Sequence, residues 1–109
     1  MTDKQRMYCL SETSKYTDKD AYVSDLALSP MWGDAEDSGI SPERIDMLGN
    51  LWDASRRSIK DICAAAGLSQ RKFAEKFCIP YRTVENWCVG VRECPIYVRL
   101  MMQQLLGLL

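Results

Sequence analysis

The feature that most constrains this chain is the close spacing of helix-starting and helix-ending residues in its second half. Ser58 and Asp61 form a capping pair, and Gly67 ends the helix that they begin. Ser69 caps the next helix, which must stop before Pro80 because the residue that precedes a proline avoids the helical conformation. The sequence therefore predicts a series of short helices joined by tight turns.

Similar signals lie on both sides of this region. At 41–43 the sequence SPE offers a capping hydroxyl, a proline whose missing N–H costs nothing in the first turn, and an acid at the positive helix end. Gly90 ends a further helix, and the last helix begins at Pro95 and runs nearly to the end of the chain. The predicted fold is all-α, with a compact helical bundle over residues 41–109.

Residues 1–40 are predicted to form a separate, less regular and acidic extension. Polar and apolar side chains alternate only loosely at its start, which leaves a strand near 6–10 and an ordered arm as alternatives. Apolar residues at helical intervals then predict a short helix over about 18–28. The stretch 29–39 combines proline, glycines and acids, a composition that is typical of turns and linkers.

The charge of the chain is divided between two halves of opposite sign. Residues 1–55 contain five basic and eleven acidic side chains, a net charge of −6. Residues 56–109 contain nine basic and four acidic side chains, a net charge of +5. The basic half is a candidate surface for a polyanion. The acidic half is most simply a solvated surface, and its functional interpretation is an arm that binds a protein partner or mimics the charge of nucleic acid.

Composition excludes several classes of function. The chain has no histidine, which removes the commonest general base and the commonest metal ligand, so we expect no enzyme, no metal and no cofactor. Its five cysteines form no Cys-x-x-Cys pair, which indicates reduced thiols in the cytoplasm. The longest apolar run, over 97–109, is too short and too polar to span a membrane.

Two of the predicted helices have the pattern of a helix-turn-helix, in which a first helix braces a second one that can enter a DNA major groove. The connection between them is the tripeptide at 78–80, and Ala74 provides the small residue that the close helix crossing requires. Five larger residues occupy the positions of the small core between the helices: Phe73, Phe77, Ile79, Val84 and Trp87.

A resemblance to a known family rests on three short motifs and one glycine: LSQ at 68–70, FAE at 73–75, TVENW at 83–87, and Gly90. They resemble the Cro/CI-type helix-turn-helix of phage repressors and related small bacterial regulators, and the match covers about a third of the chain. This resemblance implies a DNA-binding regulator from a phage or another mobile element. Family members carry glycine at the position of Cys78, where the turn needs a left-handed residue.

The recognition helix is predicted over 81–89, with Arg82 and Asn86 as neighbours on its outer face. Arginine suits O6 and N7 of guanine, asparagine suits N6 and N7 of adenine, and Glu85 between them can accept from cytosine N4. The simpler alternative is that Arg82 pairs with Glu85 on an exposed surface. The full predicted set of DNA contacts is Gln70, Arg71, Lys72, Tyr81, Arg82, Thr83, Glu85, Asn86 and Arg92.

The last helix is apolar on more sides than one core can cover. Ile96, Leu100, Met101, Leu105 and Leu108 are predicted to fill the core. Val98, Met102, Leu106 and Leu109 are predicted to need another cover, which is either the N-terminal segment or a second protomer. Because operator-binding modules of this type commonly pair, we favour a homodimer.

Two functional hypotheses follow from these patterns. The first is a sequence-specific regulator that binds double-stranded DNA, with the sub-case of an antitoxin whose N-terminal segment binds a toxin. The second is a protein inhibitor of the anti-CRISPR type, which would use the helix-turn-helix fold or the acidic segment against a nuclease that handles nucleic acid. An enzyme is the weakest hypothesis because no acid, base and nucleophile occur together.

Overall fold

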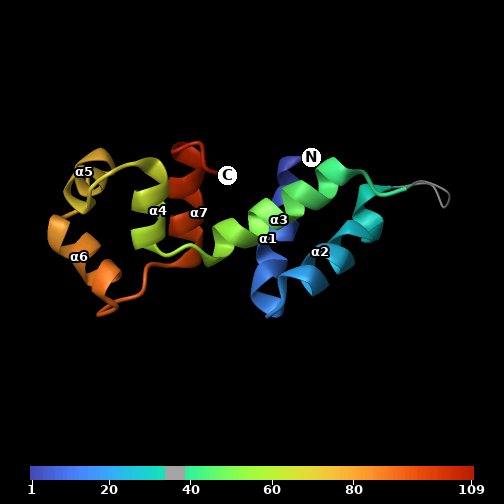
Figure 1. The fold of residues 1–109 in the computed structure, drawn as a ribbon, viewed down its shortest axis with the longest axis horizontal. Helices are drawn as coiled ribbons and strands as arrows, with labels where there is room; N and C mark the ends of the chain where they lie inside the picture. The colour runs from blue at the N-terminus through green and yellow to red at the C-terminus, as the bar shows by residue number, and fades with distance from the viewer. Residues whose placement is uncertain (34–38) are drawn as a thin grey trace. The chain divides into compact units, whose positions relative to one another are not determined.

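The computed structural model describes residues 1–33 and 39–109, and its regular structure is helical in both ranges, with no strand (Figure 1). The all-α prediction is therefore confirmed. The acidic centre of the predicted linker, residues 34–38, lies outside the described residues. No helix in the described ranges is long and apolar enough to cross a lipid bilayer. The chain divides into two compact units, Met1–Ser55 and Arg56–Leu109.

Unit 1, Met1–Ser55, is more regular than predicted. Its elements are α1 (Asp3–Glu12), the 3₁₀ turn η1 (Thr13–Lys15), α2 (Lys19–Ala27), the 3₁₀ turn η2 (Pro30–Trp32) and α3 (Pro42–Arg56), of which the last residue belongs to unit 2.

The alternative of a strand near 6–10 is wrong, because these residues lie in α1. Thr2 begins this helix as a capping box: its Oγ1 accepts from the Gln5 N–H at 3.1 Å, and its own N–H donates to Gln5 Oε1 at 2.9 Å. This capping box satisfies backbone N–H groups of the first helical turn that would otherwise lack acceptors. The loose alternation of polar and apolar residues did not indicate a helix start here. The predicted helix over 18–28 is confirmed as α2, which begins when Asp18 accepts from the Ala21 N–H.

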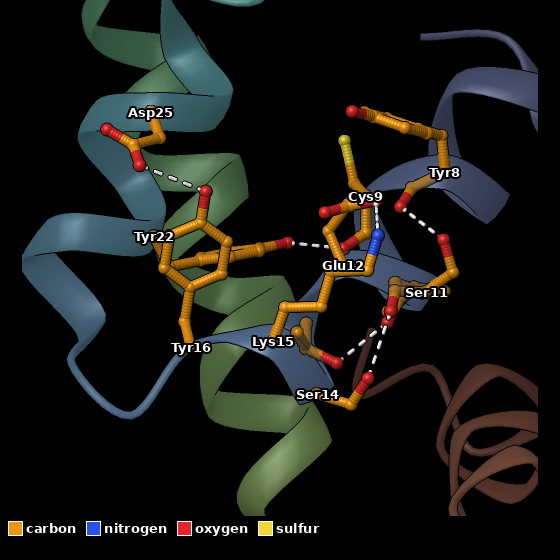
Figure 2. A network of polar contacts seen from close by, with 11 residues as sticks. Tyr8, Cys9, Ser11, Glu12, Ser14, Lys15, Tyr16, Tyr22 and Asp25 are labelled. Carbon is orange, nitrogen blue, oxygen red and sulfur yellow. Dashed lines mark hydrogen bonds and ion pairs between the residues drawn. The ribbon is translucent and has the colours of Figure 1, made fainter.

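Tyr22 connects the helices of unit 1. Its side chain is fully buried, and its hydroxyl donates to the backbone carbonyl of Cys9 at 2.7 Å (Figure 2). At the end of α1 the Thr13 N–H donates to the carbonyl of Leu10. The Tyr22 ring also lies 5.3 Å from the ring of Trp52. One side chain therefore joins α1, α2 and α3.

The structure places the boundary between the units after Ser55, which differs from the boundary after residue 40 that the sequence predicted. Helix α3 contacts α2 and η2, which precede it in the sequence. Arg44 donates to the carbonyl of Ala27 at 3.2 Å and lies over the Trp32 ring at 4.5 Å, and the Trp32 indole donates to Leu26. These long-range contacts place α3 with the N-terminal helices, and capping signals alone do not encode them.

Unit 2, Arg56–Leu109, contains α4 (Ile59–Ala66), α5 (Gln70–Lys76), α6 (Tyr81–Val89) and α7 (Ile96–Leu105). The predicted caps are present: Ser58 and Asp61 form a capping box, and Ser69 Oγ accepts from the Lys72 N–H at 3.1 Å. Gly67 and Gly90 end their helices in the left-handed conformation. The buried core consists of Ile59, Ile62, Cys63, Phe73, Ala74, Val84, Cys94 and Met102.

The predicted faces of α7 are wrong for most of their residues, although Leu108 packs against the core as predicted. Met102 lies in the core and Val98 and Leu106 pack against it, whereas Met101 and Leu105 are 55% and 74% exposed.

The rotation of α7 follows from a buried polar side chain. Gln103 is fully buried, and its Oε1 accepts from Arg57 Nη1 at 3.0 Å. This hydrogen bond satisfies a polar group that would be costly to bury alone. The sequence-based assignment of the α7 faces did not include the hydrogen bond from Arg57 to Gln103. Of the four residues predicted to need a second cover, Leu109 is half-buried, and the other three belong to or pack on the core of unit 2.

Replacing Tyr22 by phenylalanine should lower the free energy of unfolding by about 1–3 kcal/mol, because the Cys9 carbonyl would lose the buried hydrogen bond from the Tyr22 hydroxyl. Urea unfolding of the two chains measures this difference. The matched control is Tyr8→Phe, since the Tyr8 phenol is exposed and should contribute less than about 0.5 kcal/mol. Equal losses in both variants would contradict the role of the hydrogen bond.

Candidate nucleic-acid interface

Helices α5 and α6 pack closely against each other and are joined by residues 77–80 (Figure 1). Phe73 and Ala74 on α5 and Val84 on α6 are buried, and the rings of Phe73 and Phe77 lie 4.9 Å apart. Ile79 and Trp87 pack against the same core. The residues that the sequence predicted for the core between these helices are therefore in place.

The turn after α5 depends on Cys78, whose φ of 55° makes it the one described non-glycine residue in the left-handed region. The Ile79 N–H donates to the Ala74 carbonyl at 2.9 Å, and the Cys78 N–H donates to the Glu75 carbonyl at 3.3 Å. This pair of bonds is the Schellman motif, which satisfies the last carbonyls of a helix and turns the chain. The left-handed conformation expected at this position is confirmed.

The outer face of α6 is set by the burial of Val84, which has no exposed surface. Arg82 is exposed, and Glu85 and Asn86 are half-buried on the same helix. The spacing of four residues places Arg82 and Asn86 on one face. An arginine and an asparagine thus share one face of a helix whose other side is fixed in the core.

The alternative in which Arg82 pairs with Glu85 is not realised in this structure. Neither side chain forms an ion pair or a hydrogen bond with another residue of the described chain. The guanidinium of Arg82 therefore keeps its N–H donors for a ligand, and Glu85 keeps its carboxylate oxygens as acceptors.

The first turn of α6 adds open backbone donors. Pro80 precedes it and supplies no side-chain cap. Within the described residues no group accepts from the N–H of Tyr81 or Arg82, whereas the Thr83 N–H donates back to Pro80. Open N–H groups at the positive end of a helix suit a phosphate oxygen.

The first turn of α5 lies beside that of α6 through one stacked pair. The guanidinium of Arg71 lies over the Tyr81 ring at 4.3 Å, and this ring also packs on the core of unit 2. Tyr81 was predicted to point outward, and the structure shows instead that it supports Arg71. Lys72 is exposed next to Arg71, and Gln70 is half-buried.

The remaining predicted contacts lie around these helices. Thr83 is half-buried on α6, and Arg92 is exposed on the loop that follows. Sequence reasoning missed Val89, which is 72% exposed and lies three residues beyond Asn86. Its spacing of seven residues from Arg82 was the available signal, because seven residues are close to two helical turns. A valine there can contact the methyl group of thymine.

Three of the four cysteines of unit 2 are at least partly buried, Cys63, Cys88 and Cys94. Burial raises the pKa of the Cys63 thiol to about 11, and it also raises the pKa values of Cys88 and Cys94. These thiols are therefore protonated at neutral pH and are poor nucleophiles. Over residues 1–33 and 39–109 the structure brings together no group of three or more Cys, Asp or Glu side chains that could hold a metal ion.

Comparison with protein families, curated proteins and solved structures gives no match to this chain. The properties of the α5–α6 surface are thus the basis for a functional assignment. This surface combines free cationic and amide groups, open backbone donors and an exposed valine on one closely packed pair of helices.

Replacing Cys78 by glycine should raise the free energy of unfolding by about 0.5–1 kcal/mol. A left-handed conformation costs a residue with a Cβ about 1–2 kcal/mol, and the greater freedom of glycine in the unfolded chain offsets part of this gain. Urea unfolding measures the change. Cys78→Ala is the matched control, since it removes the thiol and keeps the Cβ. A gain in the alanine variant equal to that in the glycine variant would contradict the role of the turn.

Proposed function

We propose that unit 2 is a DNA-binding domain of the helix-turn-helix class and that the chain is a sequence-specific, repressor-like regulator. The observation that carries this proposal is the face of α6, where Arg82 and Asn86 are available to a ligand while Val84 is locked in the core. The proposal includes no catalytic step. It places the protein in the cytoplasm, where a regulator of a phage or mobile element reaches DNA.

In this proposal the side chains of α6 distinguish base pairs. Arg82 donates to guanine, Asn86 forms its pair of hydrogen bonds with adenine, and Glu85 accepts from the amino group of cytosine. Val89 adds an apolar contact. The half-buried state of Glu85 and Asn86 limits their freedom, so little conformational entropy is lost when they bind.

The surrounding groups would hold the DNA backbone. Arg71, Lys72 and Arg92 are exposed, and the first turn of α6 offers its open N–H groups. The net charge of +5 belongs to residues 56–109, which are the residues of unit 2. Phosphate contacts of this kind supply affinity and orientation, whereas the base contacts supply specificity.

The first test is the binding of the full chain to a duplex from its own upstream region. Affinity should fall steeply between about 50 and about 200 mM salt as counterions return to the phosphates. Binding that is absent even at the lower salt concentration would remove the proposal.

A second candidate function is supported by a groove on unit 1. This groove of about 830 Å³ is lined by α2 and α3 and the residues next to them. Leu28 and Ile45 are 71% and 44% exposed along it, and its charged side chains are Asp20, Asp46 and Lys19, a net charge of −1. A groove with apolar side chains and a net negative charge suits a basic amphipathic segment of another protein. A toxin held by an antitoxin, or a nuclease held by an inhibitor of the anti-CRISPR type, would present such a segment.

Replacing Arg82 or Asn86 by alanine should each weaken binding to the preferred duplex by about 1–3 kcal/mol and leave random DNA nearly unchanged. Lys72→Ala should weaken binding to both duplexes alike, because a phosphate contact is independent of sequence. Competition titrations at one fixed salt concentration measure these differences. Equal losses on both duplexes for all three variants would show that α6 touches only the backbone.

The proposed homodimer would use the exposed face of α7 in place of the residues predicted from sequence. Tyr97, Met101 and Leu105 are all more than half exposed and follow one another at intervals of four residues. Leu105→Glu should therefore give a folded monomer, whereas Met102→Glu should destabilise the fold by several kcal/mol because its carboxylate would be buried. Light scattering and circular dichroism measure the two effects. A wild-type monomer at tens of micromolar would contradict the dimer.

A further inference from the structure

Unit 2 contains a hollow of about 380 Å³ next to the loop that follows α6. Three arginines line it, and they come from different parts of the unit: Arg56 ends α3, Arg92 lies in the loop, and Arg99 lies on α7. Folding thus brings Arg56 together with Arg92 and Arg99, which lie more than 35 residues later in the sequence.

Arg99 and Arg92 differ in how their side chains are held. Arg99 is held in place, since its Nη1 donates to the carbonyl of Arg57 at 2.6 Å. The side chain of Arg92 is exposed and forms no hydrogen bond or ion pair with the described part of the chain. One guanidinium is therefore fixed at the wall, and another is available to close over a ligand.

The other residues that line the hollow suit a small anion that carries an aromatic ring. Ser58 Oγ accepts from the Asp61 N–H at 3.1 Å and keeps its own proton for donation. Trp87 contributes an aromatic side chain, which can stack on a planar base. Glu93 is the one acid in the lining, and it is exposed and forms no ion pair with a described residue. The lining therefore has a net charge of +2.

We propose that this hollow binds a phosphate group. Arginine presents paired N–H donors that match phosphate oxygens, and a hydroxyl donor completes the set. The volume is at the lower end of the range for small-ligand pockets and suits a nucleoside monophosphate. The phosphate has two sources: a free nucleotide, which would make the hollow an effector site, or the backbone of bound DNA, in which case this inference rests on the proposed function.

The first arm of the test uses ¹⁵N-labelled full chain titrated with inorganic phosphate and with adenosine 5′-monophosphate at constant ionic strength. If the hollow binds the phosphate of a free nucleotide, the amide signals of Ser58 and Gly90 and the indole signal of Trp87 shift on titration. Arg56→Gln and Arg92→Gln should each weaken this binding at least about tenfold. Lys76→Gln is the matched control, because Lys76 is exposed on α5 and does not line the hollow.

The second arm measures the salt dependence of duplex binding. If the source is the DNA backbone, neither small phosphate binds. Arg56→Gln and Arg92→Gln then each reduce the slope of log affinity against log salt by about one, while Lys76→Gln leaves it unchanged. The inference is overturned if both arms are negative, or if Lys76→Gln has the same effect as the arginine variants. Nucleotide binding without any duplex binding would support the hollow and remove the proposed function.

Discussion

The arrangement of the candidate interface depends on one tight turn. Cys78 adopts a left-handed backbone so that the last carbonyls of α5 are satisfied within two residues and the chain can enter α6 at Pro80. This geometry brings α6 against α5 at Ala74, where only a small side chain allows close approach. Once Val84 is buried in that contact, the outer face of α6 is fixed, and Arg82 lies on it without a hydrogen bond or ion pair to the described residues.

A buried polar network fixes the other side of unit 2. Gln103 has no exposed surface, and its amide connects Arg57 to α7, while Arg99 of the same helix donates back to the Arg57 carbonyl. A buried amide without partners would cost about 1–3 kcal/mol, so the network favours the rotation of α7 that lets Gln103 reach Arg57. That rotation exposes Leu105 and also places Arg99 in the wall of the arginine-lined hollow.

The division of charge coincides with the division into units. Residues 1–55 carry the net negative charge and residues 56–109 the net positive charge, and the structure separates the chain at the same point. Each unit can therefore present a surface of one dominant sign to a different partner. Unit 1 has its own core around Tyr22 and its own groove, which is consistent with a protein partner there and a polyanion on unit 2.

The sequence by itself determined the helices of residues 41–109 and their caps, because these features depend on side chains within a few residues of one another. The left-handed turn at Cys78 was expected only from the resemblance to a family that carries glycine there. It also determined that Val84 faces inward and Arg82 outward, since helical periodicity encodes that difference. Only the tertiary structure decided that α3 belongs to unit 1 and which face of α7 is buried. It also decided the support of Arg71 by Tyr81 and the meeting of three arginines at one hollow. Each of these depends on a partner that is distant in sequence, and local propensity and periodicity carry no information about such partners.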